Sequence, residues 1–92
     1  MFYVISYDIR DDRRRARLAR ALLDFGGVRV QYSVFECWLK PRLLGELRVR
    51  VAGLVDEEED SVRFYRLCQS CVDEVEIVGA GYVLEDVDLY IV

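Results

Sequence analysis

The sequence predicts a single α+β domain whose strands and helices follow in the order β-α-β-β-α-β. The chain has 92 residues, a length that suits one domain. Two segments repeat apolar residues at helical spacing. The segments around them are rich in β-branched and aromatic residues, as strands are. This order is that of the ferredoxin-like sandwich, and we interpret the C-terminal extension as an extra strand.

The first strand and the first helix are separated by an acidic turn. Residues 2–9 are apolar on both faces, which is typical of a central strand. Asp11 or Asp12 can cap a helix that runs to about Phe25. The glycine pair at 26–27 is expected to end this helix.

The middle of the chain predicts a strand pair and a second helix. Residues 28–39 change their apolar phase, so we expect a turn or bulge around Ser33 and Val34. Pro41 suits the first turn of the following helix. Residues 56–60 are all acidic and are expected to form a solvated loop. The apolar face of the second helix comprises Leu44, Leu47, Val51 and Leu54.

The last third of the chain predicts further extended structure. Residues 61–68 and 74–78 are expected to be strands, with a turn at 79–81. Residues 82–92 alternate apolar and acidic side chains toward their end. A four-stranded sheet leaves no place for this segment. We therefore expect residues 80–92, roughly, to pair with a sheet edge of a second subunit, in the interface of a homodimer.

Charge is unevenly divided between the two halves of the chain. The formal net charge is −4, but residues 1–50 carry 11 basic and 6 acidic residues, whereas residues 51–92 carry 2 basic and 11 acidic residues. Six arginines fall between positions 10 and 20. This local cluster favours nucleic acid as a partner in spite of the acidic total. The alternative is that the halves neutralise each other across the fold or a dimer.

Asp8 is the candidate centre of chemistry. It shares a strand face with Ser6 and directly precedes the arginine cluster. A carboxylate in an apolar strand is unfavourable unless it is solvated, hydrogen-bonded or bound to a metal, and Mg²⁺ prefers oxygen ligands. Helix capping, or a salt bridge to Arg10 or Arg13, would account for Asp8 without a metal. Chemistry based on histidine is excluded, because the chain has none.

Three arginines, at positions 13–15, stand in the first turn of the predicted helix. Cations are unfavourable there by roughly 0.3–1 kcal/mol each, because a helix N-terminus carries partial positive charge. A bound phosphate would offset this cost, since helix amides and guanidinium groups would converge on the anion. A solvated charged face is the simpler alternative.

The cysteines are Cys37, Cys68 and Cys71. The last two have the spacing of redox or zinc sites, but without histidine a four-ligand zinc site is not completed. Buried thiols or an incidental local disulfide are the favoured interpretation. The chain shows neither a signal-peptide pattern nor an apolar run of membrane length, so we expect a cytoplasmic protein without a membrane partner.

Two motifs lie at a characteristic distance from each other. The first is Tyr7-Asp8-Ile9, followed by aspartates at 11–12 and arginines at 14–15. The second, at residues 30–36, is Val-Gln-x-Ser-Val-Phe-Glu. Together with the length and element order of the chain, these motifs resemble the small CRISPR-associated adaptation endonucleases, the Cas-two family.

The resemblance implies a homodimer in which Asp8 of each subunit faces its counterpart and binds Mg²⁺, with Mn²⁺ as the alternative ion. It implies metal-dependent cleavage of phosphodiesters in RNA or DNA, with Asp8 as the catalytic residue. It also implies a complex with the larger CRISPR integrase subunit during spacer acquisition. The residues that would position nucleic acid or shape the site are Tyr7, Arg15, Arg17, Arg29 and Phe35.

Several alternatives stay open at this point. Phe35 could pack in the core, and Arg29 could lie on a solvated strand face. The protein could be a non-catalytic dimeric hub that holds duplex DNA and bridges integrase subunits. A toxin-like ribonuclease of similar fold is a third hypothesis. A ligand-binding regulatory domain is disfavoured, because the arginine cluster suits a polyanion better than a small molecule.

Overall fold

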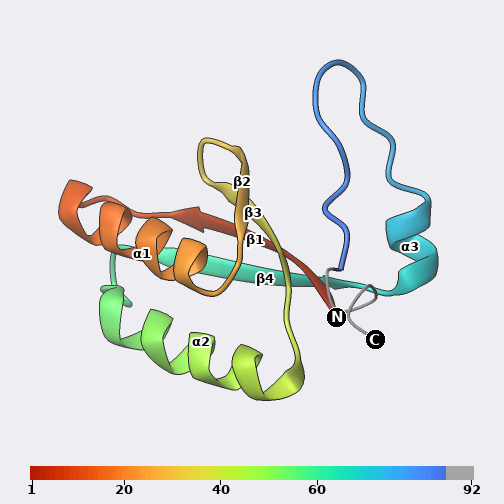
Figure 1. Cartoon of the computed structure of the whole chain (residues 1–92). Helices are drawn as coiled ribbons and strands as arrows, with labels where there is room; N and C mark the ends of the chain where they lie inside the picture. Colours follow the sequence, from red (N-terminus) through yellow and green to blue (C-terminus); the bar gives the residue numbers. More distant parts are fainter. Residues whose placement is uncertain (87–92) are drawn as a thin grey trace.

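A four-stranded antiparallel sheet in the order β2-β3-β1-β4 carries two helices on one face (Figure 1). The structure is a computed structural model that describes residues 1–86. The elements are β1 (Phe2–Asp8), α1 (Asp12–Asp24), β2 (Val28–Gln31), β3 (Val34–Trp38), α2 (Pro41–Leu54), β4 (Ser61–Leu67) and α3 (Gln69–Asp73). The predicted ferredoxin-like α+β fold is therefore confirmed. None of the helices in this part of the chain combines the length and apolarity of a membrane span.

The central strand β1 divides the sheet into two different faces. It pairs with β3 along one edge and with β4 along the other. Tyr3, Ile5 and Tyr7 are buried against α1 and α2, on what we call the helix-covered face. Ser6 and Asp8 alternate with them and lie on the opposite, open face. The core of the helix-covered face also includes Leu18, Leu22, Phe35, Cys37, Leu44 and Leu47.

α1 begins and ends where the sequence predicts. Asp11 is its N-cap, and its carboxylate accepts a hydrogen bond of 2.9 Å from the backbone N–H of Arg14. The chain leaves the helix through Gly26, whose φ of +85° favours glycine. The N–H of Gly27 then donates to the carbonyl of Leu22 at 2.8 Å. A Cβ at Gly27 would lie 2.7 Å from that carbonyl oxygen, so the close approach requires glycine.

The predicted phase change between β2 and β3 is confirmed. Tyr32 and Ser33 form the turn, and the register of the pair shifts between Arg29 and Gln31. The following helix, α2, starts at Pro41 as predicted. Its buried residues are Leu44, Leu47 and Val51.

The chain after β4 differs from the prediction. The strand expected at 74–78 is wrong, because α3 ends at Asp73 and residues 74–86 form a loop without helix or strand. The helical turn is stabilised by burial of Val72 and by a hydrogen bond of 2.9 Å from Gln69 to Asp73. Val75 and Ile77 alternate with acidic residues as in a strand, yet Ile77 is exposed and no strand forms among residues 74–86.

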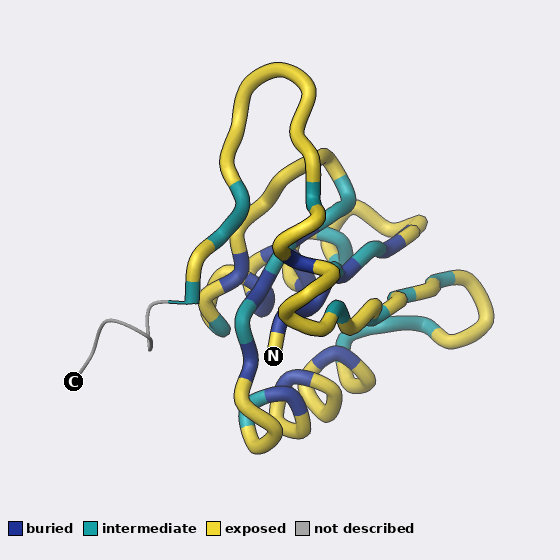
Figure 2. The backbone as a smooth tube through the Cα atoms, turned by 90° about the vertical axis from the view of Figure 1, so that its right-hand side faces the viewer, coloured by how far each residue is buried: buried dark blue, intermediate teal, exposed yellow. Residues whose placement is uncertain are grey.

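This 74–86 loop rises beside the sheet and returns to it, and its tip is exposed (Figures 1 and 2). The indole N–H of Trp38 donates to the carbonyl of Leu84 at 2.7 Å, which anchors the returning limb to β3. The predicted segment 82–92 lies partly outside the described residues, which end at 86. Its place in a dimer interface stays a prediction.

Gly27→Ala should destabilise the fold, whereas Gly45→Ala should stabilise it. The Gly27 variant forces a methyl group against the Leu22 carbonyl, and we expect the free energy of unfolding to fall by more than about 1 kcal/mol. Gly45 lies inside α2 with nothing within 4 Å of an added Cβ, so alanine should add about 0.5–1 kcal/mol. Urea unfolding measures the free energy of unfolding of both variants. Equal changes in the two variants would contradict the prediction.

Candidate functional site

The carboxylate of Asp8 stands at the end of β1 on the open face. Asp8 is exposed and lies opposite Ser61 of β4 in the sheet register. Within residues 1–86 it forms no salt bridge, so the alternative explanation, a pairing with Arg10 or Arg13, is not found there. A shallow hollow of about 250 Å³, the Asp8 hollow, is lined by Ser6, Tyr7, Asp8, Ser61, Arg63 and Tyr65.

Helix capping does not engage Asp8 either. Asp11 performs that role, and the backbone N–H of Arg14 lowers the pKa of the Asp11 carboxyl. Asp8 therefore keeps an exposed carboxylate that is available to a ligand.

The sequence analysis missed three members of the Asp8 hollow, all on β4: Ser61, Arg63 and Tyr65. Arg63 lies opposite Ser6 in the register and donates to the Tyr65 hydroxyl at 3.2 Å. This hydrogen bond raises the pKa of Arg63. The sequence does hold a signal for these residues: alternate residues of β4, beginning with Ser61, point to the same face of the sheet. It becomes informative only once β4 is known to lie beside the end of β1.

The Asp8 hollow contains oxygen atoms of the type that bind a hard cation, but only a few of them. The Asp8 carboxylate and the hydroxyls of Ser6 and Ser61 are the oxygen ligands that Mg²⁺ prefers. No group of three or more His, Cys, Asp or Glu residues that could hold a metal occurs among residues 1–86. A metal site here would therefore take further ligands from water, substrate or a second copy of the chain.

Asp60 joins the acidic loop to the start of α1. Its side chain is 0% exposed and accepts a bond of 2.8 Å from Nε of Arg14. The backbone N–H groups of Asp56 and Arg10 add bonds of 2.9 and 3.1 Å. The Arg14 guanidinium, helped by these amides, lowers the pKa of Asp60 to about 2. The prediction of a wholly solvated loop is therefore wrong at Asp60, because its solvent-shielded carboxylate pairs with the partly exposed Arg14 and closes the loop onto α1.

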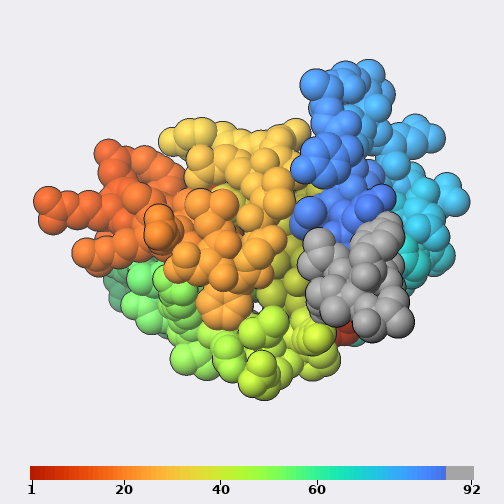
Figure 3. All heavy atoms as spheres, in the orientation of Figure 1, coloured from red at the N-terminus to blue at the C-terminus, as the bar shows by residue number. Residues whose placement is uncertain are grey.

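Arg15 is likewise held within the chain. It donates to the carbonyl of Ile9 at 3.0 Å and forms an ion pair with Asp12, and this pair raises its pKa. Carboxylates of the chain thus compensate Arg14 and Arg15, so their first-turn positions do not require a phosphate. Arg17 is exposed and has no salt bridge among the described residues. Figure 3 shows side chains at the start of α1 projecting from one end of the molecule.

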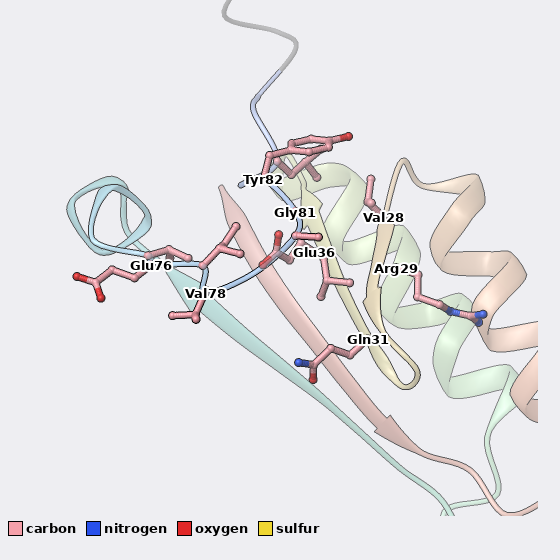
Figure 4. Close-up of a pocket in the computed structure, with 13 residues that line it drawn as sticks. Val28, Arg29, Gln31, Glu36, Glu76, Val78, Gly81 and Tyr82 are labelled. Carbon is pink, nitrogen blue, oxygen red and sulfur yellow. The ribbon is translucent and has the colours of Figure 1, made fainter.

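Tyr7, Arg15 and Arg29 come together on the helix-covered face, where they line a second hollow of about 220 Å³ beside α1. Tyr7 is 5% exposed, and its hydroxyl has no hydrogen-bond partner among residues 1–86. Figure 4 shows Arg29 pointing toward α1. Asp8 belongs to the other face, because neighbouring residues of β1 alternate in direction.

Phe35 packs in the core beneath Arg29. Its side chain is 0% exposed, and the Arg29 guanidinium carbon lies 5.3 Å from the ring centroid. The core-packing alternative for Phe35 is thus confirmed. Through this cation–π contact, the buried Phe35 ring helps to position the exposed Arg29 side chain.

A third hollow, of about 490 Å³, lies away from Asp8, between the β2–β3 pair and the 74–86 loop (Figure 4). Val28, Gln31 and Glu36 line its sheet side, and Tyr82 lines its loop side. Burial raises the pKa of Glu36, although the backbone N–H of Leu84 partly opposes the shift. This hollow shares no lining residue with the Asp8 hollow.

The fold and the site define a small ferredoxin-like protein with a free carboxylate at the end of its central strand and a basic first helix. Proteins of this class include the small CRISPR-associated proteins. The chain belongs to the Cas2 family, because the family model described as CRISPR associated protein Cas2 matches residues 1–75. The resemblance found in the sequence is therefore confirmed.

Relatives and solved structures agree with this assignment. The chain is 48% identical over its whole length to a Chloroflexus aurantiacus protein named CRISPR-associated endoribonuclease Cas2 1, which it covers completely. It superposes on the Streptococcus pyogenes Cas2 crystal structure with a TM-score of 0.75 and 33% identity, covering 86% of this chain and 100% of the other. A chain of a partial Cas6-RT-Cas1–Cas2 complex gives a TM-score of 0.71 and 29% identity, with coverages of 90% and 98%.

Asp60→Asn should lower the midpoint temperature of thermal unfolding. It should also make this midpoint depend less on pH in the acid range. The folded-state pKa of Asp60 is about 2, below its ordinary value of 3.8. Its ionised form therefore stabilises the fold fully above that ordinary value, and this stabilisation is lost as the pH falls through the folded value. Thermal unfolding followed by circular dichroism across this acid range checks the difference from wild type.

Glu59→Gln is the matched control for Asp60→Asn. Glu59 also contacts Arg14, at 3.2 Å, but its side chain is 60% exposed. Its neutralisation should change the thermal midpoint little. Equal decreases of the thermal midpoint in the two variants would contradict the role of Asp60. So would an Asp60→Asn midpoint that depends on pH in the same way as that of wild type.

Proposed function

We propose that this protein is a dimeric, metal-dependent endonuclease of CRISPR spacer acquisition, with Asp8 of each subunit at its catalytic centre. Membership of the Cas2 family supports a role in CRISPR adaptation. The endoribonuclease name of the Chloroflexus aurantiacus relative supports nuclease activity with RNA as substrate. We propose DNA as a further substrate. The observation that carries the proposal is that Asp8 is exposed on the open face and has no cationic partner among residues 1–86.

A second copy of the chain on the open face would complete the site. Neither α1 nor α2 covers this face, and apolar side chains such as Val28 and Tyr65 stay accessible on it. Accessible apolar residues of this kind suit a protein partner. A two-fold axis brings identical surfaces together, so the Asp8 hollows of two subunits would face each other.

The paired Asp8 carboxylates, with the hydroxyls of Ser6 and Ser61 beside them, would hold Mg²⁺ or, alternatively, Mn²⁺. When bound, such an ion supplies the Lewis acidity that polarises a phosphodiester and activates water. Asp8 is positioned for this role by the pairing of β1 on both edges. Arg63, in the same hollow, adds a fixed positive charge that attracts a phosphate backbone.

Nucleic acid would be held by the arginines that the fold leaves exposed. Arg17 projects from α1, and Arg29 is supported from below by the Phe35 ring. Guanidinium groups bind phosphate through two parallel hydrogen bonds, which favours arginine in such positions. Tyr7 lines the second hollow beside Arg15, where it would shape the site rather than contact nucleic acid, because its hydroxyl is buried.

A second candidate function is a non-catalytic dimeric hub that holds duplex DNA and bridges integrase subunits. One observation favours it: the chain resembles a chain of the partial Cas6-RT-Cas1–Cas2 complex. Both functions use the same basic surface and both imply a complex with the larger integrase subunit. They differ in whether Asp8 performs chemistry.

Asp8→Ala should abolish Mg²⁺-dependent cleavage of end-labelled RNA and DNA by the purified protein. Because Asp8 is exposed and unpaired within residues 1–86, the free energy of unfolding should stay within about 0.5 kcal/mol of wild type. Glu46→Ala, which removes an exposed carboxylate of α2, is the matched control and should cleave normally.

The same variants separate the two candidate functions. Cleavage that persists in Asp8→Ala and in excess chelator would sink the nuclease proposal. Loss of cleavage with unchanged spacer acquisition in cells would identify the hub as the biological role. A monomer at micromolar concentration by light scattering would remove the paired site altogether.

Arg17→Ala should weaken duplex DNA binding and reduce its salt dependence. Each lost phosphate contact lowers the slope of log K against log salt by about 0.9 on duplex DNA. Arg48→Ala is the matched control, because Arg48 is an exposed arginine of α2 outside the cluster. Fluorescence anisotropy at several salt concentrations measures both slopes, and identical slopes for the two variants would contradict the role of Arg17.

A further inference from the structure

The fold brings Cys68 and Cys71 together at an exposed junction. Cys68 follows β4 directly, and Cys71 lies one turn later in α3. Their Sγ atoms are 3.5 Å apart and both residues are exposed, whereas Cys37 is buried in the core. The interpretation as buried thiols is therefore wrong for this pair. The nuclease and hub functions leave both thiols unused.

We propose that Cys68 and Cys71 form a thiol–disulfide exchange site, which oxidised glutathione or a similar low-molecular-weight disulfide closes to a local disulfide and a thiol reductant reopens. Residues three apart on a helical turn have Cβ atoms roughly 5–6 Å apart, close to bridging range. The sulfurs must approach from 3.5 Å to a bond of about 2.05 Å. Side-chain rotation with a small backbone adjustment accomplishes this without refolding.

The two thiols have unequal roles. The Ser70 hydroxyl lies 3.1 Å from Sγ of Cys68 and, with the backbone N–H of Cys71, lowers the pKa of Cys68 to about 7. The neighbouring Cys68 sulfur raises the pKa of Cys71. The thiolate is the attacking form, so Cys68 is the attacking residue and Cys71 the resolving one.

The exchange balances in two displacement steps. The Cys68 thiolate attacks one sulfur of oxidised glutathione, which forms a mixed disulfide and expels one glutathione thiolate. Cys71, after losing its proton to solvent, attacks Sγ of Cys68 and expels the second glutathione thiolate. The protein loses two electrons and two protons, and both glutathione molecules leave as thiols. A dithiol reductant reverses the sequence.

Metal binding is the weaker use of the same pair. Structural zinc takes four ligands. The pair supplies two, and no group of three or more candidate ligands occurs among residues 1–86. The test below includes zinc as an outcome that would overturn the proposal.

Closure of the disulfide would constrain the point from which the 74–86 loop departs. Val72, between the two thiols and the loop, is buried. It lines a hollow of about 380 Å³ together with Trp38 and residues 83–86 of the returning limb. We therefore expect slower amide hydrogen exchange at residues 69–75 in the oxidised protein.

The experiment titrates the full chain with glutathione redox buffers, followed by acid quenching, native alkylation and intact mass measurement. The reduced wild type should be alkylated at Cys68 and Cys71 but not at Cys37. Oxidation should remove two hydrogen masses and block both alkylations, with an unchanged far-ultraviolet spectrum. Dithiothreitol should restore them. A wild type that stays reduced, or that keeps a stable glutathione adduct, would overturn the proposal.

Two single variants assign the roles. Cys71→Ser should accumulate the mixed disulfide on Cys68, because the resolving thiol is missing. Cys68→Ser should react several-fold more slowly with oxidised glutathione. A Cys68→Ser variant that reacts with oxidised glutathione as fast as wild type would contradict the assignment of Cys68 as the attacking residue. Stoichiometric zinc that copurifies and protects both thiols would show a metal site instead.

Discussion

The pairing of β1 along both of its edges is the constraint on which the rest of the structure depends. A strand held by β3 on one side and β4 on the other cannot slip without breaking both ladders. Its alternation therefore fixes Tyr7 on the helix-covered face and Asp8 on the open face. The core, the Asp8 hollow and the second hollow are all consequences of this register. A shift by one residue would bury the carboxylate and expose the aromatic side chain.

The arginines at the start of α1 have different roles in the folded protein, although they form one cluster in the sequence. Arg14 is tied to Asp60 and Arg15 to Asp12 and the Ile9 carbonyl, so these two arginines support the structure. Arg17 stays exposed, and we propose that it contacts nucleic acid. The number of arginines in the cluster therefore overstates the number available to bind a partner, because carboxylates of the chain pair with Arg14 and Arg15.

Sequence reasoning succeeded where local physics decides the structure. Asp11 and Gly26 mark the ends of α1 by capping and by φ, and neither depends on the rest of the chain. It failed where the partner is distant or the segment is short. Asp60 meets Arg14 across 46 positions, so the acidic run alone looked solvated. α3 has only 5 residues, too few to show a helical period, and Arg63 joins the site only through the register of β4.

The same geometry bears on how an acidic protein could present the nucleic-acid surface that we propose. The start of α1 and the 74–86 loop lie at opposite ends of a molecule 39 Å long (Figure 3). At physiological salt, charges are screened over about 8 Å. A phosphate backbone that approaches Arg17 would therefore hardly respond to the acids of the 74–86 loop. The acidic run 56–60 is different, because Glu59 and Asp60 pair with Arg14 beside the start of α1 and offset part of its positive charge. The net charge of −4 therefore describes no single surface of the protein.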